Sequence, residues 1–112
     1  MTKNVEVEIF EIISNGGNAK AIAYEGLSKA HEGKFEEADQ LLKDAHVELN
    51  KAHNTQTSLI QAELNGDSFE KSLLMIHAQD HLMTSISEIT LIEQMIPMLK
   101  RIHQLETNKE EE

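Results

Sequence analysis

One segment, from Ser68 to Leu105, constrains the fold most, because its sequence is apolar around most of a helix circumference. As an α-helix it would be on the order of 55 Å long. A helix that is apolar on several sides requires cover on several sides, and a chain of 112 residues cannot supply it alone. We therefore expect self-association through this segment, in preference to a tolerated exposed patch. Its large apolar residues are Leu73, Leu74, Met75, Ile76, Leu82, Met83, Ile86, Ile89, Leu91, Ile92, Met95, Ile96, Met98, Leu99 and Ile102.

Two further segments with helical spacing precede it, from about Asn4 to His31 and from Lys34 to Leu64. Gly33 separates them, and "NGD" (65–67) ends the second. The chain has one Pro, five Gly, one Tyr, three Phe and no Trp, a composition that favours helices over strands. The sequence therefore predicts a single all-α domain over residues 1–112, an antiparallel three-helix bundle.

The ends of the third helix are less clearly marked. Asp67 or Ser68 would cap its start. Pro97 removes a backbone donor inside the helix and should kink or break it. Residues 106–112 are expected to form a disordered acidic tail.

The overall charge and the absence of cysteine exclude several classes of function. A formal net charge of −10 argues against nucleic-acid binding and is compatible with a basic protein partner. Without cysteine there can be no disulfide, no thiol catalysis and no zinc site with thiolate ligands. No apolar stretch reaches the length of about 20 residues that spans a bilayer, and "MTKNVEVEIF" lacks the features of a signal peptide. We expect a cytosolic protein that does not insert into membranes.

The motif "LLMIHAQDHLMTS" (73–85) places two histidines and an aspartate inside this apolar segment. Such groups cost free energy there unless they are paired, hydrogen-bonded or used. Since each helical residue advances by about 100°, Asp80 lies about 60° to one side of His77 and His81 about 40° to the other. All three share one helix face. Gln79, about 160° from His77, would serve only the site of a neighbouring chain.

Several interpretations of this face stay open on spacing alone. Zinc hydrolysis is disfavoured, because Ala78 stands where the H-E-x-x-H motif has its glutamate. Asp80 could bind a hard cation such as Mg²⁺ if several copies converged on a symmetry axis. His77 could accept a phosphoryl group as a nucleophile, with His81 donating to the phosphoryl oxygens. The alternative is a non-catalytic helical oligomeric adaptor, in which these side chains are structural and organise a metal site.

The same motif resembles the signature of the lactose/cellobiose-type enzyme IIA of the bacterial phosphoenolpyruvate-dependent sugar phosphotransferase system (PTS). The resemblance continues in "EIISNGGNAKAIAYEGLSKAHEGKFEEADQLLKDA" (11–45) and "LNKAHNTQTSLIQAELNG" (49–66), and so covers most of residues 9–105. The combination of the histidine motif with "GNAKAIAYE" and "LNKAHNTQT" makes it specific.

This resemblance implies a homotrimer of three-helix subunits that carries phosphoryl groups. The IIA protein accepts one from phospho-HPr on a histidine and passes it to a cysteine of the IIB component, which phosphorylates the sugar during transport by the membrane component IIC. The phosphohistidine corresponds to His77, and His81 is carried over as active-site support. Asp80 corresponds to the residue that binds a magnesium-like ion on the trimer axis. No organic cofactor is implied.

The resemblance does not identify the sugar, because IIA contacts HPr and IIB and never the sugar. Overall similarity favours cellobiose, chitobiose or a related β-diglucoside over lactose.

Overall fold

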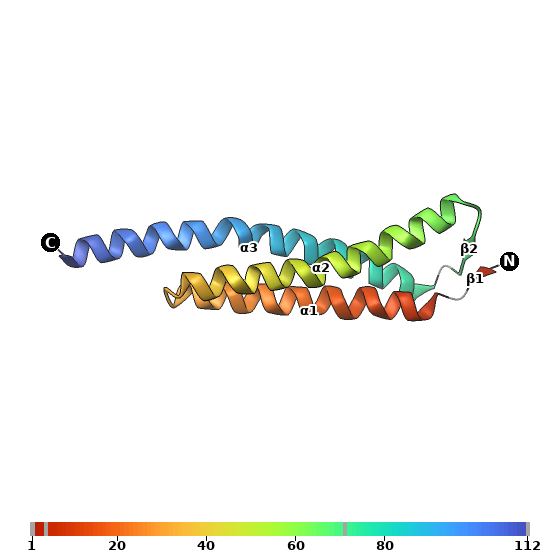
Figure 1. Cartoon of the computed structure of the whole chain (residues 1–112), viewed down its shortest axis with the longest axis horizontal. Coiled ribbons are helices and arrows are strands. Elements are labelled where there is room, and N and C mark those ends of the chain that lie inside the picture. Colours follow the sequence, from red (N-terminus) through yellow and green to blue (C-terminus); the bar gives the residue numbers. More distant parts are fainter. Residues whose placement is uncertain (1, 4, 71, 112) are drawn as a thin grey trace.

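The computed structural model of the chain describes residues 2–3, 5–70 and 72–111. Its elements are β1 (Thr2–Lys3), α1 (Glu6–His31), α2 (Phe35–Leu64), β2 (Ser68–Phe69) and α3 (Leu73–Glu111). α2 runs back along α1, and α3 then runs in the same direction as α1 (Figure 1). The predicted all-α three-helix bundle is confirmed.

Glycines end the first two helices, as the sequence predicted. Gly33, with φ of 80°, follows α1, and the Lys34 N–H donates back to the Lys29 carbonyl over 2.9 Å. Gly66, with φ of 106°, follows α2. Residues with a side chain rarely adopt this left-handed conformation, so glycine permits both sharp turns.

The third helix begins later than the sequence predicted. Ser68 and Phe69 form β2, which pairs in parallel with β1, so neither Asp67 nor Ser68 caps α3. Ser72 does so instead: its Oγ accepts a hydrogen bond of 3.1 Å from the Met75 N–H. The prediction failed here because a long-range strand pairing competes with the local capping signal.

α3 extends past the turn between α1 and α2 and carries the C-terminus away from the bundle (Figure 1). The exposed Pro97 lies inside it without breaking it. The helix also continues to Glu111, across most of residues 106–112, where the sequence suggested a disordered tail. Glu, Gln and Lys are strong helix formers, which favours this continuation.

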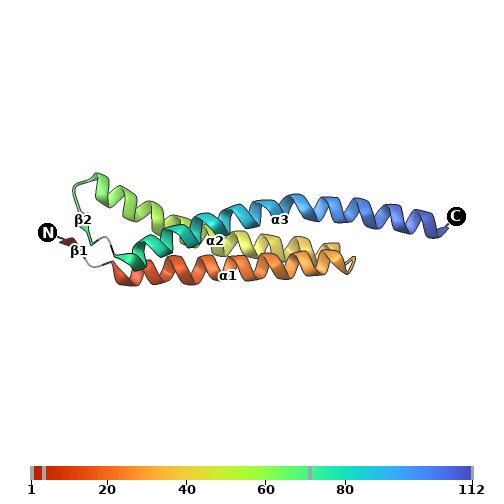
Figure 2. The same ribbon diagram turned by 180° about the vertical axis from the view of Figure 1, so that it is seen from behind.

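Small residues line the interface between α1 and α2. A Cβ atom at Gly26 would lie only 3.3 Å from the Ala38 carbonyl oxygen, so this glycine permits a close approach of the two helices. The C-terminal part of α2 bends away from α1 in both views (Figures 1 and 2). As a result α3 packs mainly against α1. The alanines that are fully buried in the bundle are Ala19, Ala23, Ala38, Ala45 and Ala52.

The described part of the chain contains no helix that is long and apolar enough to cross a membrane. The cytosolic location expected from the sequence stays a prediction.

Leu82 of α3 is expected to contribute strongly to stability. It is 0% exposed, and it lies close to Gly16 of α1, where an added Cβ would be 3.9 Å from Leu82 Cδ1. Leu82→Ala should lower the free energy of unfolding by about 2–5 kcal/mol, through lost burial and the cavity left behind. Urea unfolding at one fixed protein concentration measures this. Leu64→Ala, at a residue 80% exposed, is the matched control and should change stability by less than about 0.5 kcal/mol; equal effects of the two variants would contradict the described core.

Candidate functional site

His77, Asp80 and His81 lie together on one side of α3, as the helical spacing predicted. The rings of His77 and His81 meet edge to face, with centroids 6.0 Å apart and planes at 63°. His77 and Asp80 are exposed, whereas His81 is half-buried. The side chain of His77 is therefore open to a partner, and that of His81 is held more closely by its surroundings.

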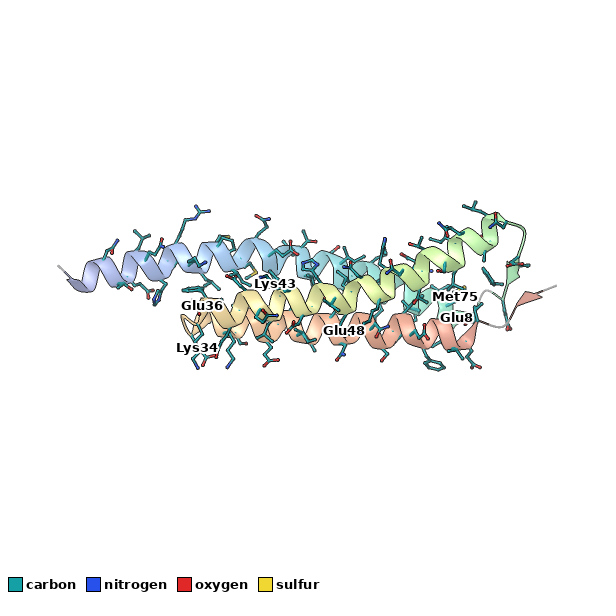
Figure 3. All side chains as sticks on the ribbon, viewed as in Figure 1. Glu8, Lys34, Glu36, Lys43, Glu48 and Met75 are labelled. Atoms are coloured by element: carbon teal, nitrogen blue, oxygen red, sulfur yellow. The ribbon has the colours of Figure 1, made fainter. Side chains whose placement is uncertain are left out.

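The site lies near the start of α3, at the end of the bundle that also holds the start of α1. Figure 3 labels Met75 and Glu8 at this end, and Lys34 and Glu36 at the distant α1–α2 turn. An open hollow beside the site is lined by His77 with Leu73 and Leu74. A partner's side chain can thus approach His77 over an apolar surface.

Two neighbours of His81 were missed by the sequence reasoning. Ser85, fully buried one turn later on α3, has its Oγ 3.2 Å from Nδ1 of His81. Gly17 of α1 borders the opposite edge of the ring, where a Cβ would be 3.5 Å from Nε2. The spacing of four residues between His81 and Ser85 was a detectable signal in the sequence. The approach of Gly17 depends on how α1 packs against α3, and no local pattern marks it.

Glu88 links α3 to α1 beyond these histidines. Its carboxylate accepts a hydrogen bond of 2.7 Å from the Tyr24 hydroxyl and lies 2.9 Å from Lys20 Nζ. The hydrogen bonds from Tyr24 and Lys20, with the nearby positive charge of Lys20, lower the pKa of Glu88 below its ordinary value. The same contacts raise the pKa of Tyr24 and of Lys20. Glu88 is thus ionised at neutral pH, with its charge offset by Lys20.

The expectation that Gln79 would serve only the site of a neighbouring chain stays a prediction. Its side-chain oxygen accepts a hydrogen bond from the amide of Gln56, a buried residue of α2 in the same chain. The helical angle directs Gln79 away from His77, and this hydrogen bond holds its side chain against α2.

A single chain does not fit a divalent cation at this site. Asp80 is exposed and offers one carboxylate. Over residues 2–3, 5–70 and 72–111, no three side chains of His, Cys, Asp or Glu are grouped so as to hold a metal ion. The Mg²⁺ ion expected from the sequence therefore has no ligand set within one chain.

Asp80 lies within an exposed face of α3 that we call the apolar strip. Its members are three, four, seven or eight residues apart, which are spacings of one or two helical turns, so they form one stripe along the helix. This stripe faces away from the core residues Leu82, Ile89 and Ile92. It leaves much of the apolar surface of α3 without cover from α1 or α2. The members of the strip are Leu73, Ile76, Met83, Leu91, Met95, Met98, Ile102 and Leu105.

The arrangement is suited to nucleophilic chemistry by histidine. A neutral imidazole has one nitrogen with a free lone pair, and His77 presents its ring to solvent. The second imidazole, His81, is held near it and can donate a hydrogen bond to a group bound there.

Comparison with known proteins places this chain in a family. The family model of the lactose/cellobiose-specific IIA subunit of the PTS matches residues 7–100. The chain is 43% identical over 102 residues to the lichenan-specific phosphotransferase enzyme IIA component of Bacillus subtilis, covering 91% of this chain and 93% of that protein. It is 34% identical over 100 residues to the N,N'-diacetylchitobiose-specific EIIA component of Escherichia coli K12, covering 89% and 86%.

Solved structures agree with these relatives. The cellobiose-specific enzyme IIA of Bacillus anthracis has a TM-score of 0.87 and 41% identity, with 93% of this chain and 95% of that chain covered. A chain from the IIA(Chitobiose)–HPr complex of Escherichia coli has a TM-score of 0.77 and 33% identity, with 91% and 99% covered. The resemblance found in the sequence is confirmed, and the chain belongs to the lactose/cellobiose-specific IIA family, the phosphotransferase components of sugar PTS transporters.

Proposed function

We propose that this chain is a phosphoryl carrier that accepts a phosphoryl group from phospho-HPr on His77 and passes it to a cysteine of a IIB component. The exposed imidazole of His77, with the half-buried imidazole of His81 beside it, is the observation that carries the proposal. The family supports the chemistry. The solved complex of the Escherichia coli relative with HPr supports HPr as the donor.

Two displacements at phosphorus make up the proposed cycle. In the first, a ring nitrogen of neutral His77 attacks phosphorus with its lone pair, and the bond between phosphorus and HPr breaks, leaving its electron pair on HPr. In the second, a IIB thiolate attacks the same phosphorus, and the bond to His77 breaks and returns the electron pair to the ring. His77 ends the cycle unchanged, so the transfer requires no organic cofactor.

The charges around the site bear on the approach of a phosphoryl group, which is itself an anion. Lys20 offsets the charge of Glu88, and His81 can donate a hydrogen bond to a phosphoryl oxygen. The carboxylate of Asp80, exposed on the same side of α3, opposes the approach. The exposed position of His77 also suits a residue that HPr and IIB must each contact in turn.

We extend the proposal to a homotrimer assembled through the apolar strip of α3. The strip runs along the helix, more sparsely between Ile76 and Leu91, and is uncovered in one chain, which supports a partner surface of the same kind. Asp80 lies on the strip between Ile76 and Met83, so three copies would approach one another near the symmetry axis. A shared cation such as Mg²⁺ would offset their repulsion, and no transfer step depends on it.

Replacing Asp80 by leucine tests this placement. If three carboxylates meet in the assembly, Asp80→Leu should leave the trimer intact or stabilise it, by up to about 4 kcal/mol, because apolar contacts replace buried charges. Sedimentation over a range of concentrations, with and without a chelator, measures the effect. Dissociation of Asp80→Leu into monomers would instead show that assembly requires the metal-binding carboxylate.

The transported sugar is proposed only as a class, a disaccharide such as cellobiose, chitobiose or lactose. The relatives are named for lichenan, galactose, lactose, cellobiose and N,N'-diacetylchitobiose, although they share one family. This variety supports the view that the IIB and IIC components determine which sugar is transported. This chain would serve IIC only indirectly, through IIB.

A reconstituted relay tests the proposed function. The chain is incubated with radiolabelled phosphoenolpyruvate, enzyme I and HPr, separated from them, and then mixed with a IIB component that contains its cysteine. We expect the label to enter this chain and to leave it when IIB is added, whereas a IIB variant with serine at that cysteine leaves the label in place. If this chain takes up no label while the relative from Bacillus subtilis is labelled in parallel, the result would favour the non-catalytic adaptor.

A further inference from the structure

Gly17 lies inside α1, next to the ring of His81. A Cβ atom at this position would be 3.5 Å from Nε2 and 3.9 Å from Cε1 of His81. These are ordinary contact distances, so an alanine side chain would fit without displacing the ring. The missing side chain of Gly17 therefore leaves space beside Nε2 of His81.

The backbone gives no reason for a glycine here. Among the described residues, positive φ angles occur only at Gly33 and Gly66, so Gly17 has an ordinary helical conformation. A glycine inside a helix destabilises it relative to alanine. Since alanine would both fit and favour the helix, the absence of a side chain at position 17 calls for another explanation.

The other nitrogen of His81 is already engaged. Its Nδ1 lies 3.2 Å from the Oγ of Ser85, which is fully buried. When the Ser85 hydroxyl donates to Nδ1, a neutral ring carries its proton on Nε2. Nε2 is then the donor that remains, and it borders the space left by Gly17. The ring of His77 lies next to that of His81, with 6.0 Å between the ring centroids.

We propose that Gly17 is a positioning residue, which keeps open the space where Nε2–H of His81 donates a hydrogen bond to an oxygen of the phosphoryl group on His77. Ser85 acts with it by holding the other ring nitrogen. This inference rests on the proposed function of the chain. It makes the space between α1 and α3 part of a phosphoryl-binding site that is completed only when His77 is phosphorylated.

Two alanine variants one residue apart provide the test. Gly17→Ala adds a methyl group next to Nε2 of His81, whereas Gly16→Ala adds one that would meet only Leu82 Cδ1, at 3.9 Å. Both should unfold at a midpoint equal to or above that of the wild type, since alanine favours the helix. Only Gly17→Ala should slow acceptance of the phosphoryl group from phospho-HPr, by about 10- to 100-fold, as expected for the loss of one hydrogen bond to a charged oxygen.

Two further measurements separate a positioning role from a structural one. In a His81→Ala background, Gly17→Ala should have no additional effect on the transfer rate, because the residue acts through His81. In ¹⁵N NMR spectra of histidine-labelled protein, the Nε2 signal of His81 should shift on phosphorylation in the wild type and in Gly16→Ala. It should stay in place in Gly17→Ala.

Each outcome bears on the proposal. If the wild type accepts phosphoryl groups and Gly17→Ala accepts them as fast as Gly16→Ala, the role of Gly17 is overturned and the carrier function stands. An equal slowing by Gly17→Ala with and without His81 would also overturn it, as would an unfolding midpoint of Gly17→Ala well below that of Gly16→Ala. If the wild type itself accepts no phosphoryl group, the proposed function fails and this inference fails with it.

Discussion

His77→Ala is expected to abolish phosphoryl transfer through this chain completely. The variant removes the nucleophilic nitrogen, and the sequence contains no cysteine whose thiol could act as the nucleophile instead. His77 is exposed, so its removal leaves the packing of α3 intact. Label incorporated from phosphoenolpyruvate through enzyme I and HPr should fall to background, while circular dichroism and sedimentation stay as in the wild type.

His31→Ala and His81→Ala are the controls for this result. His31 is also exposed and ends α1, at the far end from the site, so its replacement should leave the rate unchanged. His81→Ala should slow the transfer without abolishing it, because His81 donates a hydrogen bond to the phosphoryl group and His77 is the residue that accepts the group. A His77→Ala variant that still accepts label, together with a His81→Ala variant that does not, would show His81 to be the acceptor.

Leu91→Glu is expected to dissociate the proposed trimer. Leu91 is 62% exposed in one chain and lies in the middle of the apolar strip. In the assembly this substitution would remove about 1.5–3 kcal/mol of apolar burial per chain and bring three like charges together. Sedimentation should show monomers at concentrations where the wild type is a trimer.

Val47→Glu is the matched control for this variant. Val47 is a large apolar residue of similar exposure, 55%, but it belongs to α2 and lies outside the strip. Its replacement should leave the oligomeric state unchanged. If Val47→Glu dissociates the assembly and Leu91→Glu does not, the contact between chains lies on α2 instead.

Local sequence signals determined most of the fold correctly. The glycines at 33 and 66 ended two helices where left-handed backbone angles require them. Apolar residues around most of the third segment also predicted that one chain could not cover all of α3, and one chain does leave many of them exposed. The spacing of His77, Asp80 and His81 also placed them on one side of a helix, because their relative directions depend only on helical geometry.

Features that depend on contacts between distant segments could not be predicted in this way. Pairing of β2 with β1 moved the start of α3 to Leu73. The contacts of Glu88 with Lys20 and Tyr24 depend on how α3 lies along α1. The position of Gly17 beside His81 also depends on how α3 lies along α1.

The central claim is that His77 carries the phosphoryl group, and intact-protein mass spectrometry tests it most directly. The wild-type chain is incubated with phosphoenolpyruvate, enzyme I and HPr, and kept at mildly alkaline pH, where phosphohistidine survives. We predict the added mass of one phosphoryl group per chain, with fragment ions that locate it on His77. No added mass, or a phosphoryl group located on His81, would contradict the claim.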